Sequence, residues 1–136
     1  MGSTVCLECP KCGYAFRAVM YGRSLNGEEV DRILEMRKKD SEIINVYKHM
    51  KKKRIFSKIN VYTCNKCVDY YNYENLILEG EDGTYHESRG VCPKCKKSDG
   101  VKIDNERFLM MPGEKSKMIC PKCLENLVVT GGGILD

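Results

Sequence analysis

The chain has 136 residues, of which 31% are charged, with no Trp and only three Phe. Its length allows one ordinary domain or two small ones, and its low aromatic content predicts a thin core of the kind that bound metals often stabilise. The sequence has no apolar run of the roughly 20 residues that span a bilayer, and its N-terminus does not resemble a signal peptide. We therefore expect a soluble, cytoplasmic protein.

Residues 1–79 are expected to form an N-terminal zinc ribbon with a helical insert. Residues 1–19 contain the first Cys-x-x-Cys pair, Cys9 and Cys12, followed directly by Gly13. The residue after such a pair often needs a left-handed backbone conformation, which Gly adopts without steric cost. The apolar residues within 14–19 then indicate a short strand.

The helical insert covers about residues 24–54. Asn26 followed by Glu29 predicts a helix N-cap with a weak form of the capping box. The apolar face shifts in phase along the segment, which predicts either two helices joined near Asp40–Ser41 or one bent helix. The segment ends in the basic run Lys51, Lys52, Lys53 and Arg54, and cations in a last helical turn favour the helix dipole.

Residues 55–79 are rich in β-branched and aromatic residues on both sides of the second pair, Cys64 and Cys67. This pattern predicts a strand, a tight turn and a returning strand. Residues 80–90 are polar and rich in turn-forming residues, so we expect a linker loop.

Residues 91–130 are expected to form a C-terminal zinc ribbon. They contain the third pair, Cys92 and Cys95, and the fourth, Cys120 and Cys123. Strand candidates are 101–103, 108–111, 118–119 and 127–129, with a turn at Pro112–Gly113. The glycines of the tail, residues 131–136, predict a loose end.

The four Cys-x-x-Cys pairs are the most specific chemical pattern in the chain. Two residues between thiols let one turn direct both sulfurs at one ion, and four sulfurs complete a tetrahedral zinc site. Eight thiols therefore predict two zinc ions per chain, although tetrahedral sulfur also suits iron. Disulfides are disfavoured by the short spacing, the odd count of nine cysteines and the absence of a secretion signal. The predicted ligands are Cys9, Cys12, Cys64, Cys67, Cys92, Cys95, Cys120 and Cys123.

Four pairs can form two sites in three ways: in order, nested or interleaved. The intervals between successive pairs are 51, 24 and 24 residues, and a 24-residue interval suits two turns on one β-hairpin. Loop entropy separates the three schemes by less than about 1–2 kcal/mol. We favour in-order pairing, because the helical insert can close the 51-residue interval and 80–90 then serves as a linker.

Metal binding also changes the meaning of the net charge. The formal charge of +4 counts every cysteine as neutral. A divalent ion held by four thiolates has a formal charge of −2, so two sites bring the chain to about zero. The mild basicity is therefore not an argument for nucleic-acid binding.

The sequence C-P-K-C-G followed by an aromatic residue, with partner C-x-x-C pairs on hairpins, resembles the zinc-ribbon group. The order of pairs, helical insert and Gly-rich end also resembles small bacterial proteins with two zinc ribbons. Val68, Lys96 and Leu124 stand where Gly is common, a departure that affects turn geometry more than metal binding. The resemblance implies a small, metal-stabilised α+β fold with two zinc ribbons, and it implies no reaction.

Catalytic chemistry has little support in the sequence. Catalytic zinc usually keeps an open coordination position, whereas eight cysteines fill two sites completely. The deaminase, metalloprotease and nucleotide-binding signatures are missing, and four C-x-x-C pairs do not match a thioredoxin-like redox motif. We expect His49 and His86 to be solvated polar residues. Cys6 is expected to be a spare thiol, the alternative being a reactive thiol or a ligand that exchanges into the first site.

The leading prediction is a non-enzymatic module that binds a macromolecule, with no small-molecule substrate. The basic run and the interleaved tyrosines favour nucleic acid, since phosphates attract cations and bases stack on aromatic rings. The alternative is a protein-interaction subunit that uses the helical insert, including Val30 and Ile33, as its contact surface. A thiol-redox factor is a weaker third possibility. The proposed nucleic-acid contacts are Lys51, Lys52, Lys53 and Arg54.

Overall fold

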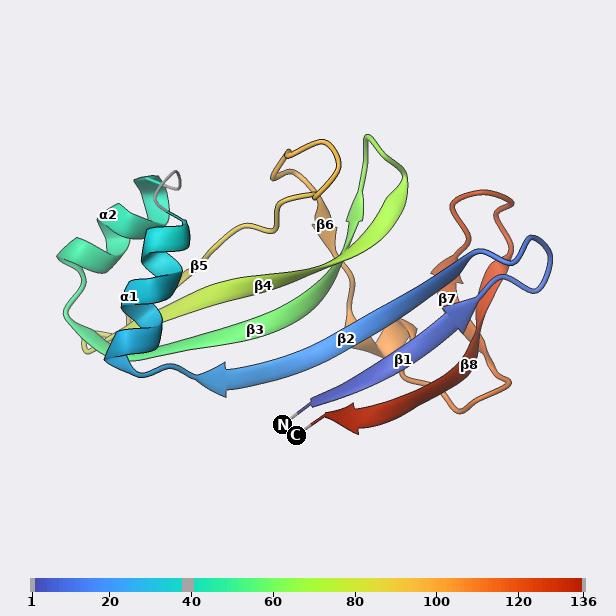
Figure 1. The fold of residues 1–136 in the computed structure, drawn as a ribbon, viewed down its shortest axis with the longest axis horizontal. Helices are drawn as coiled ribbons and strands as arrows, with labels where there is room; N and C mark the ends of the chain where they lie inside the picture. Colours follow the sequence, from blue (N-terminus) through green and yellow to red (C-terminus); the bar gives the residue numbers. More distant parts are fainter. Residues whose placement is uncertain (1, 38–40, 136) are drawn as a thin grey trace.

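The computed structural model describes residues 2–37 and 41–135. Its strands form one antiparallel sheet in the order β5-β4-β3-β2-β1-β8-β7, and β6 pairs separately with β3. The sheet is long and twisted, with both helices at one end and the β1–β2 and β7–β8 turns at the other (Figure 1). The strands are β1 (Gly2–Glu8), β2 (Ala15–Ser24), β3 (Lys52–Cys64), β4 (Asp69–Gly80), β5 (Tyr85–Glu87), β6 (Val101–Lys102), β7 (Lys115–Ile119) and β8 (Asn126–Leu135).

The two ends of the chain pair with each other in the middle of this sheet. Gly2 lies opposite Leu135 and Glu8 opposite Val128, so β1 and β8 run side by side (Figure 1). The expectation of a loose end after residue 130 is wrong for 131–135, because the three glycines lie within β8. Gly132 packs so closely on β1 that an added Cβ would lie 2.4 Å from the Thr4 carbonyl oxygen.

The helical insert consists of two helices, α1 (Gly27–Met36) and α2 (Ser41–His49), as the phase shift predicted. Asn26 caps α1: its side chain accepts a hydrogen bond from the Glu29 backbone at 2.9 Å, and the Glu29 carboxylate accepts one from the Asn26 backbone. Of the expected joint, Asp40 lies outside the described residues. The basic run does not end a helix, because α2 stops at His49 and β3 begins at Lys52.

The apolar faces of the helices pack on the sheet instead of facing a partner. Val30 is 1% exposed, which corrects its assignment to a contact surface, whereas Ile33 is only partly buried beside it. Together the two helices and strands β3 and β4 make one apolar core. Its buried members are Val30, Ile43, Ile55, Leu76 and Leu78.

A second core lies under β1, β2 and β8. Phe108 is fully buried there. It follows the 3-10 turn η1 (Asn105–Arg107) and is not part of a strand, so the expected strand at 108–111 is wrong. Cys9 and Cys120 belong to this same core. The turns that hold Cys9 and Cys120, the first and the fourth along the chain, are therefore packed into this apolar core.

The fold is thus a small α+β structure built on an antiparallel sheet. The expected hairpin over 55–79 is confirmed by the β3–β4 pairing, in which Cys64 lies opposite Asp69. The expected linker at 80–90 contains β5, which pairs with β4. None of the helices within the described residues is long and apolar enough to cross a membrane.

Candidate functional site

The same tight turn is built at all four Cys-x-x-Cys pairs. In each turn, the backbone N–H after the second cysteine donates to the carbonyl of the first, at 2.9–3.1 Å. The donors are Gly13, Val68, Lys96 and Leu124. Each of these four residues also has a positive φ, between 48° and 78°. The three positions without Gly therefore keep the same left-handed geometry, at a steric cost of roughly 1–2 kcal/mol each.

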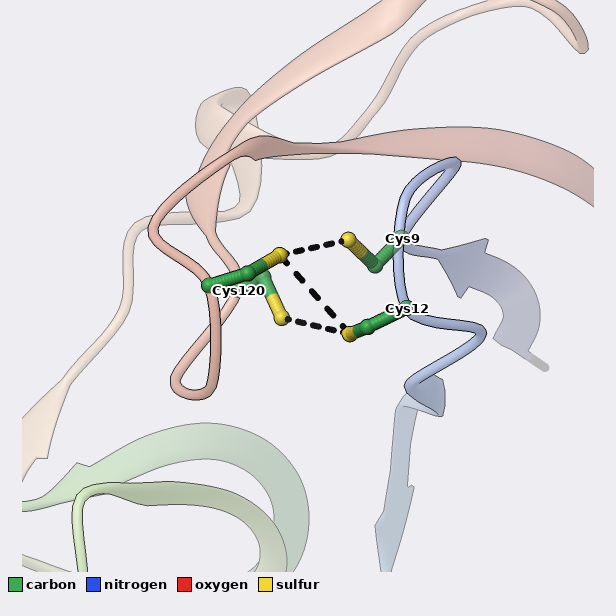
Figure 2. A group of neighbouring side chains, drawn as sticks. Cys9, Cys12 and Cys120 are labelled. Carbon is green, nitrogen blue, oxygen red and sulfur yellow. Dashed lines mark hydrogen bonds between the residues drawn. The ribbon is translucent and has the colours of Figure 1, made fainter.

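The first group of four joins the two ends of the chain. Cys9 and Cys12 lie on the turn between β1 and β2, and Cys120 lies across from them on the turn between β7 and β8 (Figure 2). The Cys9 and Cys123 sulfurs are 3.1 Å apart, and the Cys12 sulfur is 3.6 Å from that of Cys120. All four sulfurs lie within 4.8 Å of one another.

The second group joins the β3–β4 turn to the segment that precedes β6. The sulfurs of Cys64 and Cys95 are 3.6 Å apart, and those of Cys67 and Cys92 are 3.9 Å apart. Cys64 and Cys92 are buried, and the other two are half-buried. These four sulfurs also lie within 4.8 Å of one another.

The pairing is therefore nested, and the in-order scheme is wrong. Cys9 and Cys12 meet the fourth pair, because β1 pairs with β8 and brings the first and last turns together. Cys64 and Cys67 meet the third pair across the 24-residue interval between them. The division of the chain into an N-terminal ribbon, 1–79, and a C-terminal ribbon, 91–130, remains a prediction.

The spacing of the sulfurs suits a tetrahedral ion. A tetrahedron with metal–sulfur bonds of about 2.3 Å has sulfur–sulfur edges of about 3.8 Å. The distances in the second group, 3.6 and 3.9 Å, agree with this value. The first group is slightly tighter at one edge, the 3.1 Å between Cys9 and Cys123. Each group could hold a metal ion with no ligand position left over.

Backbone N–H groups favour the thiolate of the first cysteine in three of the turns. Burial raises the pKa of the Cys9 thiol, but hydrogen bonds from Cys123, Cys12 and Lys11 outweigh it and lower this pKa to about 6. The backbone of Cys95 lowers the pKa of Cys92 to about 7 against the opposing effect of burial. Burial also raises the pKa of Cys120, but hydrogen bonds from the backbone of Cys123 and Lys122 outweigh this effect and lower the pKa.

The partner thiols are shifted the other way. Burial raises the pKa of Cys67 to about 12, and hydrogen bonding with Cys9 raises that of Cys123 to about 12. Without a metal, each group therefore shares protons among its sulfurs. Binding of a divalent ion would release those protons and make affinity depend on pH.

The remaining cysteine lies outside both groups. Cys6 is half-buried on β1, opposite Arg17 of β2 and Gly131 of β8. Within the described residues, the four-sulfur group contains Cys9 but not Cys6.

The basic run is split between two surfaces. Lys51 lines a hollow of about 670 Å³ together with His49 and His86, the two histidines of the chain. His49 is exposed and its Nδ1 lies 2.9 Å from the Asn45 carbonyl oxygen. Arg54 lines a different groove, and the side chains of Lys52 and Lys53 lie outside what the structure describes.

That groove, of about 490 Å³, lies where β2 and β3 pair beside the start of β1. Arg54, Phe56 and Lys58 alternate along β3 and so share one face of it. Gly22 pairs with Lys58 and Ser24 with Phe56, which leaves small side chains opposite the large ones. Arg23 also lines the groove, but its guanidinium forms an ion pair with Glu29. The sequence analysis included Arg54 in the basic run but did not identify Phe56 or Gly22, because the groove depends on the register of β2 against β3.

Searches of protein-family models, of curated proteins and of solved structures gave no match to this chain. The likeness to zinc ribbons therefore rests on the turns and the two four-cysteine groups.

Proposed function

We propose that this chain is a non-enzymatic, zinc-stabilised module that binds single-stranded nucleic acid in the groove between β2 and β3. Zinc is the preferred ion because tetrahedral sites of four cysteines are typical of structural zinc, which leaves no open position for a substrate. Elemental mass spectrometry of the purified protein should find two zinc ions per chain. A single ion, or iron in place of zinc, would contradict this part of the proposal.

The observation that carries the nucleic-acid proposal is the alternation Arg54, Phe56, Lys58 along one strand. Two cations two residues on either side of an aromatic ring offer phosphate contacts and a stacking surface in one line. The Arg54 guanidinium lies over the Phe56 ring, 5.7 Å from its centroid, and 3.9 Å from the Glu79 carboxylate. Its side chain is 68% exposed, so a phosphate and a base would displace these surface contacts. No cysteine of either group lines this groove. Binding there leaves the metal ligands untouched.

Salt dependence is the first test. A fluorescent single-stranded 12-mer should bind with an affinity that falls steeply with salt, since phosphate contacts release counterions. Arg54→Ala and Lys58→Ala should each reduce the slope of log K against log salt by about 0.7. Lys48→Ala is the matched control, because Lys48 is a cation close to the basic run in sequence but lies exposed on α2 and does not line the groove.

A second test closes the groove from the opposite strand. Gly22 faces Lys58, and a Cβ there would make only an ordinary 3.6 Å contact with the Ser57 carbonyl oxygen. Gly22→Glu should therefore fold and abolish binding, while Gly22→Gln separates the effect of bulk from that of charge. Binding that persists in Gly22→Glu, or that does not depend on salt, would refute the groove as the site.

A further inference from the structure

Two of the left-handed turn residues have exposed apolar side chains. Val68 is 57% exposed and Leu124 is 75% exposed, and their φ angles are 48° and 63°. A positive φ is a genuine outlier for a β-branched residue such as Val68. Gly would remove the steric cost at both positions, and a polar residue would remove the exposed apolar surface. The side chains themselves therefore need an explanation beyond the turn.

Val68 and Leu124 line the same small notch. The notch has a volume of about 140 Å³ and lies between the two cysteine groups, with Val68 contributed by the second group and Leu124 by the first. Ile119, Pro121 and the Tyr70 ring complete its apolar lining. An apolar cavity of about 150 Å³ holds a benzene-sized molecule, so this one suits a single apolar side chain.

The turns that form the notch also have exposed lysines. Every Cys-x-x-Cys turn has Lys immediately before its second cysteine, and all four are exposed: Lys11, Lys66, Lys94 and Lys122. Lys94 pairs at 2.7 Å with Asp69, which lines the notch. Within the described part of the chain, Lys66 and Lys122 form no ion pair. Asp69 is the charged residue that lines the notch, and its partner Lys94 neutralises it. Lys66, in the turn of Val68, and Lys122, in the turn of Leu124, leave exposed ammonium groups in both of the turns that form the notch.

We propose that this notch, formed by Val68, Leu124, Ile119, Pro121 and Tyr70, docks a protein segment that presents one apolar side chain flanked by Asp or Glu. The apolar side chain fills the notch, and the flanking carboxylates meet Lys66 and Lys122. Because the notch has one wall from each four-cysteine group, we expect it to form only when both groups are closed. Binding of the segment would then depend on both groups holding their metal ions. It would not depend on the groove between β2 and β3.

The test begins with a phage-displayed library of random 12-residue peptides, selected on the zinc-loaded protein. Enriched peptides are synthesised and titrated into ¹⁵N-labelled protein. We expect an apolar residue next to Asp or Glu, and shifts at the amides of Val68, Tyr70, Ile119 and Leu124. Failure to enrich peptides, enrichment of basic peptides, or shifts confined to other surfaces would overturn the proposal.

The variants separate docking from stability. Val68→Gly with Leu124→Gly removes both apolar walls while easing the backbone, so the protein should keep two metal ions and its amide spectrum elsewhere. Peptide affinity should nevertheless fall at least tenfold. Lys96→Gly is the matched control, because Lys96 has the same left-handed backbone (φ 63°) but does not line the notch. Equal affinities for the double variant, the control and the parent protein would overturn the proposal.

Discussion

The Tyr14 hydroxyl donates a hydrogen bond to the Asp69 carboxylate, across 55 residues of sequence. Both residues stand two positions after a Cys-x-x-Cys pair, Tyr14 in the first four-cysteine group and Asp69 in the second. The other oxygen of Asp69 accepts from Lys94, within the third pair. Tyr70, the residue after Asp69, bonds to the backbone of Ile119, which precedes Cys120. Side-chain hydrogen bonds therefore connect the two four-cysteine groups, in addition to the strand pairing of the sheet.

Tyr14→Phe should destabilise the zinc-loaded protein by about 1–2 kcal/mol, because it removes a hydrogen bond to a charged and partly buried acceptor. Asp69 would keep Lys94 on one oxygen and the Tyr70 backbone N–H on the other, but it would lose the Tyr14 hydroxyl. Urea unfolding at a fixed free zinc concentration measures the change, since the apparent stability depends on the ligand.

Tyr85→Phe is its matched control. The Tyr85 hydroxyl also donates to a carboxylate, that of Glu87 at 3.1 Å, but Tyr85 is exposed. Its loss should change the free energy of unfolding by less than about 0.5 kcal/mol. Equal effects of the two variants would show that the Tyr14–Asp69 contact does not join the two groups.

The nested pairing predicts which cysteine substitutions act on the same ion. Cys12→Ser and Cys120→Ser should each weaken one site, and the double variant should still retain one tightly held zinc. Cys12→Ser with Cys64→Ser should weaken both sites, because these cysteines belong to different groups. Native mass spectrometry gives the number of ions per chain in each variant. In-order pairing would give the reverse pattern, with one ion lost in the second double variant and two in the first.

The sequence predicted the four Cys-x-x-Cys turns, but it did not predict which turns come together. The C-x-x-C spacing acts within four residues, so the turn and the tetrahedral preference follow from local geometry. The partner of Cys9 depends on the pairing of β1 with β8, which joins residues 2–8 to residues 128–135. The strand potential of residues 2–8 was not recognised, and the glycines of 131–133 were interpreted as a flexible tail.

Local signals were reliable where a short-range bond defines the structure. Asn26 and Glu29 predicted the start of α1, and the phase shift of the apolar face predicted its separation from α2. Phe108 shows the opposite case. Its apolar neighbours suggested a strand, but the side chain packs beneath β1 and β8 after a turn. The conformation at Phe108 depends on its burial against residues far away in sequence, which no local sequence pattern predicts.

The left-handed turn residues offer a direct test of backbone cost. Lys96→Gly should stabilise the zinc-loaded protein by about 0.5–1 kcal/mol, the steric relief less the greater flexibility of Gly in the unfolded chain. Gly13→Ala should have the opposite sign and cost about 1 kcal/mol, because φ is 78° but a Cβ would meet no atom within 4 Å. Urea midpoints at constant free zinc compare the pair. A stabilising Gly13→Ala would contradict the left-handed turn.

The glycines of β8 give the sharpest check on how the chain ends are joined. A Cβ on Gly132 would lie 2.4 Å from the Thr4 carbonyl oxygen, a backbone atom that can move only with its strand. Gly132→Ala should therefore cost about 1–3 kcal/mol, as other overpacked sites do. Gly131→Ala is the matched control, since a Cβ there meets no atom within 4 Å.

Because β1 and β8 also position Cys9 and Cys123, Gly132→Ala should weaken the first metal group more than the second. A chelator titration that follows zinc release should show one ion leaving earlier than in the parent protein and the other unchanged. The early ion can be assigned by repeating the titration in the double variant Gly132→Ala with Cys12→Ser. The early phase should disappear there, because Cys12 belongs to the first group. If Gly132→Ala and Gly131→Ala behave alike, β8 does not lie against β1 at this position and the closure of the first group needs another explanation.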